Sequence, residues 1–217
     1  MPHLESLYPT VMNTLAYRLA SSDLLLQLIR EDRDNQDNWV RIDSVALQVR
    51  KACELFLLGS TLTHLTDGAE IDLNHWHPKD TFREIQRFNL HPLPLPLEPE
   101  FRIYGETKQL VPASKPLPFA TLASIYGQCG NILHIPTAAK VLDEKIPSFD
   151  WDKYRSWVDG FTSLLRGHVL LLPQIKRVLV CTWTGNPHES LNSFLLEGDG
   201  EAILQTDGLK EFELLVA

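Results

Sequence analysis

The sequence predicts a mainly α-helical protein: a bundle of about five helices followed by a small C-terminal antiparallel β-hairpin or sheet. Through most of residues 7–172, apolar residues recur at spacings of three and four, the period of an amphipathic helix. After residue 176 the period becomes two, as expected of strands. The length of 217 residues is sufficient for one packed core.

The first predicted helix runs from Leu7 to about Ile29, with a bend or break near residues 21–23, Ser-Ser-Asp. A polar turn follows at residues 31–38, and a second helix extends from Trp39 to about Leu65. Apolar residues cover most of the circumference of this second helix. We therefore expect a central helix that is covered by other elements on several sides.

A shorter helix is predicted over 78–88, because proline is favoured in the first turn of a helix. Seven of the 14 prolines then fall in residues 92–118, which predicts extended backbone. The leucines between these prolines favour a strap laid over an apolar surface rather than a free linker. Helix is expected again over 119–135 and over 149–172, where Pro136 and Pro173 mark the ends.

The C-terminal part of the chain is predicted to form strands. Residues 177–184 and 190–196 flank the turn residues Gly-Asn-Pro, which predicts a hairpin, and residues 211–216 are a candidate third strand. The expected division is a helical bundle over 1–175, with the proline strap, and a small β extension over 176–217 packed on it. Residues 189–217 carry seven acids and one base, −6 of the total charge of −8, so this end is a candidate face for a basic protein partner.

Composition excludes several classes of protein. Hydrophobic residues make up 44% of the chain and charged residues 22%, which excludes disordered and low-complexity chains. The longest apolar runs are too short to cross a membrane, so no membrane contact is expected. The three cysteines match neither a zinc pattern nor a disulfide framework, and we expect buried free thiols in a cytoplasmic protein without a cofactor.

Polar residues interrupt the apolar faces of the second and fourth predicted helices. On the second, Arg50, Glu54 and His64 fall within one 80° arc when residues advance by 100° each. On the fourth, Tyr126 and His134 share an arc with Gly130. Glycines inside a helix cost stability, so Gly127 and Gly130 indicate close approach by a neighbouring helix or a ligand.

These residues have two interpretations. In the first, Arg50, Glu54 and His134 line a site for acid–base chemistry on a phosphodiester, with His64, Tyr126, Asn131 and His168 in support. The three histidines lie near predicted helix ends, so they could also converge on a transition metal. In the second, Arg50 and Glu54 form a structural ion pair and each histidine is a hydrogen-bonded packing residue.

Three segments are similar to a group of bacterial helical proteins that resemble the HEPN superfamily. They are residues 47–55, LQVRKACEL, the Trp76 helix running into the proline strap, and residues 126–134 followed by Pro136, within roughly residues 40 to 140. The resemblance implies a helical bundle that is a metal-independent ribonuclease or the partner of a nucleotidyltransferase, in toxin–antitoxin or phage-defence systems. It also implies a homodimer, since the catalytic residues of the family meet between two protomers.

The catalytic signature of that superfamily is an Arg followed by a His after four to six intervening residues. Here Arg83 and Arg87 precede His91 by seven and three intervening residues, so neither pair fits. If His134 stands in the place of the catalytic histidine, Arg50 is the candidate for its arginine. The resulting hypothesis is a cytoplasmic HEPN-like protein that binds or cleaves RNA or a nucleotide. The alternatives are a non-catalytic protein-interaction subunit and a His-rich metal-binding bundle.

Overall fold

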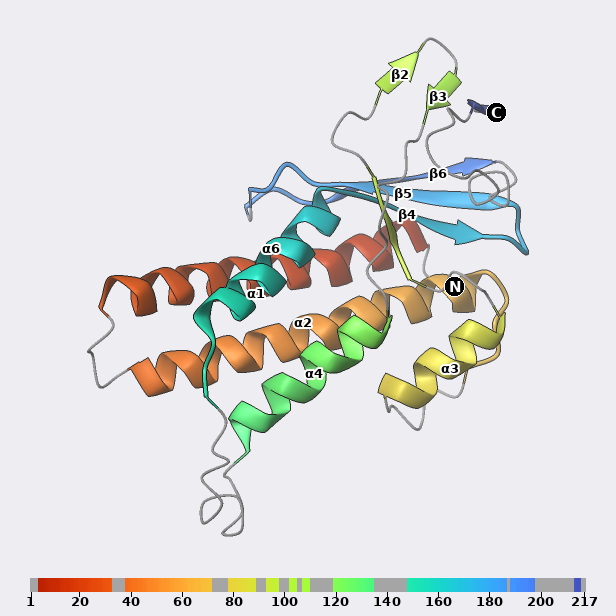
Figure 1. The fold of residues 1–217 in the computed structure, drawn as a ribbon. Helices are drawn as coiled ribbons and strands as arrows, with labels where there is room; N and C mark the ends of the chain where they lie inside the picture. The colour runs from red at the N-terminus through yellow and green to blue at the C-terminus, as the bar shows by residue number, and fades with distance from the viewer. Residues whose placement is uncertain are drawn as a thin grey trace.

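The architecture is taken from a computed structural model. The structure describes residues 4–32, 38–71, 78–88, 93–97, 102–104, 107–109, 119–134, 148–186, 188–197 and 213–215. Within these residues five helices and seven strands are present, and helix dominates, as the sequence predicts (Figure 1).

Two long helices form the spine of the molecule. Helix α1 (Leu4–Glu31) and helix α2 (Asn38–Thr66) pack against each other along their length (Figure 1). The inward side of α1 presents apolar residues at helical spacing, among them Tyr8, Met12, Leu15 and Leu19, all buried. The facing side of α2 buries Val45, Val49, Cys53 and Phe56.

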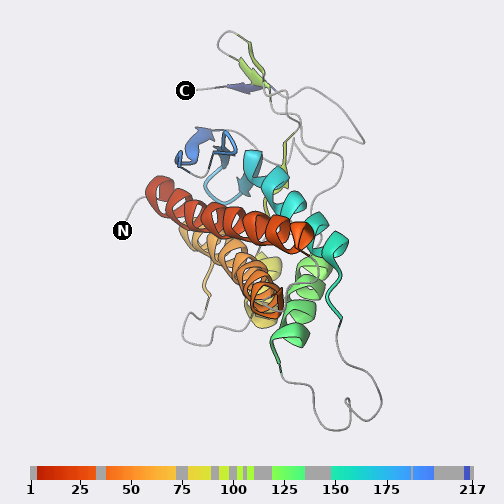
Figure 2. The same cartoon turned by 90° about the vertical axis from the view of Figure 1, so that its left-hand side faces the viewer.

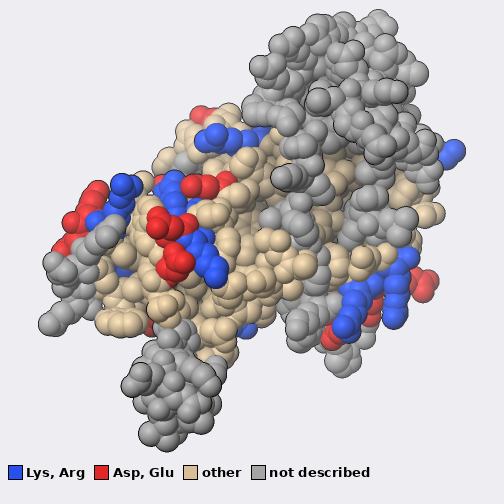
Figure 3. Space-filling view, viewed as in Figure 1, with Lys and Arg blue, Asp and Glu red and all other residues tan. Residues whose placement is uncertain are grey.

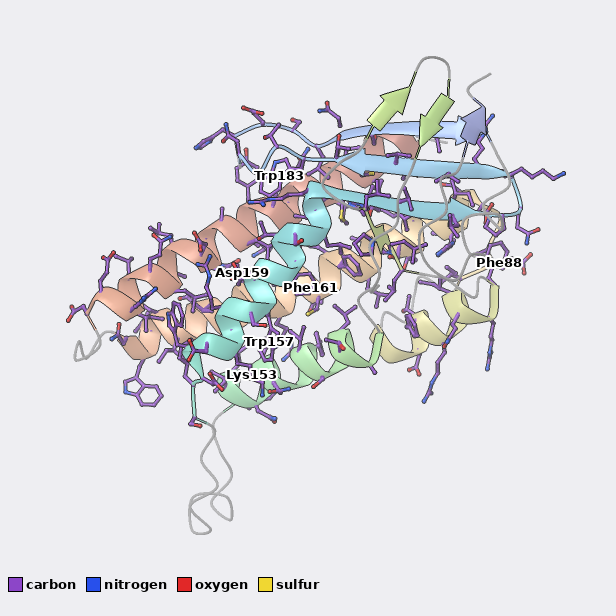
Figure 4. The ribbon with its side chains drawn as sticks, turned by 45° about the horizontal axis from the view of Figure 1, so that its top comes forward. Phe88, Lys153, Trp157, Asp159, Phe161 and Trp183 are labelled. Carbon is purple, nitrogen blue, oxygen red and sulfur yellow. The ribbon has the colours of Figure 1, made fainter. Side chains whose placement is uncertain are left out.

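Three further helices surround this pair. Helix α3 (Pro78–Phe88) packs near the end of α2, helix α4 (Phe119–Leu133) lies against α2, and helix α6 (Trp151–Arg166) lies against α1. Figures 1 and 2 place α4 and α6 on the same side of the α1–α2 pair. Phe161 of α6 points into the core and meets Phe56 edge to face, whereas Asp159 stays at the surface (Figure 4). Asp150 caps the start of α6 by accepting a hydrogen bond from the Lys153 amide.

A four-stranded antiparallel sheet covers one end of the spine. Its strands are β1 (Leu95–Pro96), β4 (Gly167–Leu172), β5 (Arg177–Thr182) and β6 (Asn192–Glu197), in the order β1-β4-β5-β6. The expected hairpin is therefore present as β5 and β6, with Arg177 opposite Glu197. Two strands of this sheet come from residues before 176, so the sheet is not confined to the C-terminal extension.

The proline strap contributes to this sheet. Leu93, Leu95 and Leu97 are all buried, in accord with a strap over an apolar surface. Leu95 pairs with Val169 of β4, and the Leu97 amide donates to the carbonyl of Gly167 at 2.8 Å. Of the remaining strap, the structure describes strands β2 (Arg102–Tyr104) and β3 (Thr107–Gln109). The other residues of 92–118 lie outside the described residues.

Three expectations about the elements are corrected. The helix predicted over 149–172 ends at Arg166, and residues 167–172 form β4, whose six residues pair with β5. Helix α1 is unbroken at Ser21 and Ser22, and each hydroxyl is satisfied inside the helix by donating to a carbonyl four residues earlier at 3.0 Å. The third C-terminal strand, β7 (Glu213–Leu215), pairs with β3 in a separate three-stranded sheet instead of extending the hairpin.

Candidate functional site

Arg50 lies at the contact between α2 and α4. Its Nη2 donates a hydrogen bond to the Tyr126 hydroxyl at 2.8 Å, and its Cζ stands 4.3 Å from the centre of the Tyr126 ring. The guanidinium therefore both bonds to the phenol and stacks over it. A stacked planar guanidinium has lost much of its freedom of motion, so it is held ready for a further partner.

Gly130 makes room for this arginine. A Cβ at position 130 would stand 3.1 Å from Arg50 Nη1, closer than ordinary packing allows. The close approach that the sequence predicts at Gly130 is confirmed, and the neighbour is a side chain. At Gly127 a Cβ would meet nothing within 4 Å, so that glycine has no packing role of this kind.

Two charged residues of α2 accompany Arg50. Glu54 Oε1 is 3.9 Å from Arg50 Nε, and Glu54 Oε2 is 2.7 Å from Lys51 Nζ. The Arg50 side chain is 25% exposed and that of Glu54 22% exposed, so this cluster is half-buried rather than a solvated surface pair. The expected pairing of Arg50 with Glu54 is present, and Lys51 is the closer partner of the carboxylate.

Arg50 keeps hydrogen-bonding capacity. A guanidinium has five N–H donors, and within the described residues Tyr126 is the acceptor that lies at hydrogen-bonding distance. Glu54 at 3.9 Å contributes charge without a hydrogen bond. A solvent-accessible guanidinium with unused donors, next to a second cation, is suited to an anionic oxygen such as that of a phosphate or carboxylate.

Asn131 and His134 are both exposed at the end of α4. The His134 amide donates to the Gly130 carbonyl at 3.1 Å, so the helical path continues to His134. Four residues along a helix advance about 6 Å, which places the His134 backbone one turn beyond the glycine that Arg50 touches. At 100° per residue His134 lies within 40° of Gly130, on the side of α4 that meets Arg50, whereas Asn131 lies about 100° round the helix from Gly130. Arg50, Glu54, Tyr126 and His134 therefore occupy one region of the α2–α4 surface, and Asn131 lies outside it.

His168 is not part of that region. It lies on β4 rather than on a helix, and it is 1% exposed. Its Nδ1 is 3.0 Å from the carbonyl of Leu164, and its Nε2 is 2.8 Å from the Tyr8 hydroxyl. A ring that donates from Nδ1 and accepts at Nε2 is neutral, and burial lowers its pKa to about 4. The packing interpretation holds for His168.

His64 also lies elsewhere. Its side chain is fully buried, and its ring lies 6.4 Å from the ring of Phe88 on α3. It follows Glu54 by ten residues, so the two are separated by about 15 Å along α2. The three histidines expected to converge are thus in three different environments. Within the part of the chain that the structure describes, no three His, Cys, Asp or Glu side chains gather into a possible metal site.

Two residues close to Arg50, Cys129 and Tyr154, were not among the candidate site residues from the sequence. Cys129 of α4 is fully buried, and Tyr154 of α6 lies beside it. Burial raises the pKa of the Cys129 thiol to about 11, although Tyr154 and Arg50 oppose that shift. The Cys53 thiol, also buried, has its pKa raised by burial as well. All three cysteines are free and buried, as expected, and a protonated Cys129 is not a nucleophile.

Asp67 is a second residue that pattern reasoning missed. This acid is 2% exposed and follows α2, where its Oδ1 accepts a hydrogen bond from the Ile175 amide at 3.0 Å in the β4–β5 turn. Burial raises its pKa, and hydrogen bonds from the turn amides oppose that shift. Asp67 therefore joins the end of α2 to the sheet. A single acid after a helix has no periodic signal that reveals such a contact.

The charged surface is mixed. Acidic and basic side chains stand next to each other wherever they gather on the face in Figure 3, instead of forming a field of one sign. Among the described residues, no helix is both long enough and apolar enough to span a bilayer. Most of the acidic C-terminal stretch lies outside the described residues, so its role as a partner face stays a prediction.

Comparison with known family models, with curated proteins and with solved structures gave no match for this chain. The HEPN resemblance therefore stays a prediction.

Proposed function

We propose that this protein binds RNA or a nucleotide through its phosphate groups at the Arg50 cluster. The observation that carries the proposal is the partly exposed Arg50 side chain, whose guanidinium is stacked on Tyr126 and has unused N–H donors. Arginine offers two parallel donors to a phosphate, which gives geometric specificity as well as charge. The proposal includes a cytoplasmic location, where both ligands are abundant.

Neighbouring side chains extend the site. Lys51 adds a second positive charge beside Arg50, while Glu54 balances part of it. The exposed ring of His134 supplies a hydrogen-bonding group of the kind that contacts sugars and base edges, while Asn131 lies about 100° round α4 from Gly130 and outside this site. Since the surrounding surface carries charges of both signs, we propose a local contact rather than a long basic track.

The geometry favours binding over cleavage. Cleavage of a phosphodiester by acid–base catalysis requires groups that accept and donate protons at the reacting oxygens. Of the three expected histidines, His134 lies at the cluster, whereas His64 and His168 are buried in other parts of the fold. A ribonuclease activity, as the resemblance implies, would therefore depend on His134, with Glu54 as the other titratable group.

Fluorescence anisotropy of a labelled single-stranded RNA, with a nucleotide as competitor, tests this proposal. Removing a hydrogen bond to a charged group costs about 1.5–3 kcal/mol, so Arg50→Ala should weaken binding by roughly 10- to 100-fold. The control is Arg83→Ala, which removes a positive charge on α3 where the side chain is 71% exposed. Equal affinity of wild type and Arg50→Ala would refute the proposal.

The same variants separate binding from cleavage. His134→Ala should abolish any RNA cleavage while it leaves most of the affinity, because Arg50 and Tyr126 remain. If the protein acts as a toxin or in phage defence, expression of the wild type should slow growth and expression of Arg50→Ala should not. Melting temperatures of both variants near that of the wild type are needed to attribute these losses to the site.

A second candidate function is a protein-interaction subunit. It is favoured by large apolar side chains on the surface of α1, Tyr17 at 53% and Leu24 at 58% exposure. The full-length protein, tagged and kept at its native level, should then co-purify with a stoichiometric partner. Tyr17→Glu combined with Leu24→Glu should release that partner and leave RNA binding intact. Co-purification unaffected by this pair would remove the α1 surface from consideration.

A further inference from the structure

Helix α2 has an apolar surface that the described elements leave uncovered. Its sequence is apolar around most of the circumference, and α1, α3, α4 and β4 pack on it. One line of residues remains on the outside, here called the outer stripe: Val40, Ser44, Leu47, Leu55, Leu58 and Leu62, with Lys51 at its centre. At 100° per residue all of them fall within about 80° of the helix circumference, so they form one continuous face.

The outer stripe is open to solvent. Its first half is the more open: Val40 is 69% exposed and Leu47 is 43% exposed, while the leucines in its second half are half-buried and Leu55 also packs against the core. Figure 2 shows α4 and α6 together on one side of the α1–α2 pair. A helix that is apolar all round is normally buried all round, so an uncovered stripe on a central helix indicates a missing partner.

We propose that this partner is a second copy of the chain, packed antiparallel along the outer stripe, with the two-fold axis at Lys51. The spacing of the stripe is symmetric about that residue: positions 40 and 62, 44 and 58, and 47 and 55 each lie equally far from 51. A two-fold axis brings each residue of such a pair against the other residue in the partner. Val40 then meets the partner's Leu62, and Leu47 meets the partner's Leu55.

The charges agree with this arrangement. Two lysines would meet at the axis, which alone would oppose association. Each Lys51 already has Glu54 at 2.7 Å, and Glu54 lies one turn along the same helix. In the antiparallel pair each carboxylate can reach the lysine of both copies, so the centre holds two positive and two negative charges. Self-complementarity in both apolar contact and charge is the property that a two-fold interface requires.

The size of the outer stripe determines how strong a dimer we expect. Its 22 residue steps extend about 33 Å, and a helix with its side chains is about 10–12 Å wide. That footprint, roughly 330–400 Å² per copy, is below the area of stable specific interfaces and within the range of weak, transient ones, so we expect a weak, reversible dimer with a dissociation constant in the high micromolar range. Lys51 belongs to both the Arg50 cluster and the outer stripe, but Arg50 itself lies about 100° round α2 from Lys51 and outside the stripe. The dimer contact does not depend on the proposed function.

Sedimentation equilibrium of the full chain measures this association, over roughly 1 to 300 µM to bracket a micromolar constant. The wild type should change from monomer to dimer over that range. Leu47→Glu should weaken the dimer at least tenfold, because each copy would bury an unpaired charge. The control is Leu24→Glu on α1, where the leucine is 58% exposed against 43% for Leu47, and it should leave the dimer unchanged. Lys51→Glu should weaken it, and Lys51→Glu with Glu54→Lys should restore it.

A cross-linking experiment tests the register. Packed helices lie 8–10 Å apart, which leaves about 5 Å between the Cα atoms of two residues on the axis, within disulfide range. Lys51→Cys should therefore form a covalent dimer with oxidised glutathione. Ser44→Cys is the control, since its two copies would stand about 21 Å apart along the helices. The native cysteines are all buried and leave these reactions unaffected.

Three results would overturn the proposal. The first is a monomer at every concentration. The second is a dimer that Leu24→Glu breaks and Leu47→Glu does not, because the contact would then be on α1. The third is cross-linking of Ser44→Cys as fast as that of Lys51→Cys, because the two-fold axis would then lie elsewhere.

Discussion

Replacement of His168 by glutamine should remove a pH dependence from the stability of this protein. The ring is 1% exposed and accepts from Tyr8 at one nitrogen while the other bonds to Leu164, so the folded protein holds it neutral. Protonation at Nε2 would break the bond from Tyr8 and bury a charge. The neighbouring Tyr8 hydroxyl and Cys181 thiol have pKa values raised by burial and stay uncharged in acid.

The magnitude follows from the pKa of His168, which is about 4 in the folded protein against about 6.5 in an unfolded chain. Between these values the unfolded state binds more protons, so stability is complete above about pH 6.5 and falls as the pH drops toward 4. At 1.36 kcal/mol per pH unit, the wild type should lose about 3 kcal/mol over this window from His168 alone.

Urea unfolding at several pH values between 4 and 7 measures this loss. The difference between wild type and His168→Gln isolates one histidine, because every other titrating group is common to both proteins. The glutamine amide can still accept from Tyr8 and donate to Leu164. His188→Gln, in an exposed position, is the matched control and should keep the full pH dependence. A wild type and a His168→Gln variant with parallel pH profiles would show that the ring is not held neutral.

Three further substitutions test individual contacts. Gly130→Ala should weaken RNA binding, measured by anisotropy, several-fold because the new Cβ displaces Arg50. The melting temperature should not fall, because alanine favours the helix. Gly127→Ala is the control, since the space around it is open, and it should leave the affinity unchanged. Asp67→Ala should cost about 1–2 kcal/mol in urea unfolding by removing the acceptor of the Ile175 amide, whereas Asp67→Asn, which keeps an acceptor, should cost less. Asp150→Ala should cost about 1 kcal/mol by thermal unfolding through loss of the α6 cap, and an unchanged melting temperature would contradict that role.

Periodicity predicted the helices well because each buries a stripe that is visible in the sequence. The end of α6 shows where this signal fails. Residues 169–172 are all apolar and buried, so they fit the helical spacing from Phe161 to Leu165 and also fit a strand buried on both faces. Gly167, at the junction, was the local sign of a change. What decides between the two structures is pairing with β5, a partner that local spacing does not reveal.

The candidate site, too, could be predicted from the sequence only in part. The contact of Arg50 with Tyr126 follows from a polar residue on each of two facing helices, and Gly130 marked the close approach. His64 and His168 looked equally suitable because the sequence places them on apolar faces. Their true neighbours, Phe88 and Tyr8, come from distant segments, and burial alone made them packing residues. Sequence identified which polar residues are unusual, and tertiary contacts separated those that face solvent from those that do not.

The most direct test of phosphate binding at Arg50 is an NMR titration that follows the Arg50 Nε–H signal as RNA or a nucleotide is added. We expect this signal and the ring signals of Tyr126 to shift together and to saturate with one constant, while the ring signals of the buried His168 stay in place. Saturation of shifts elsewhere on the molecule, with the Arg50 and Tyr126 signals unmoved, would contradict the proposed site.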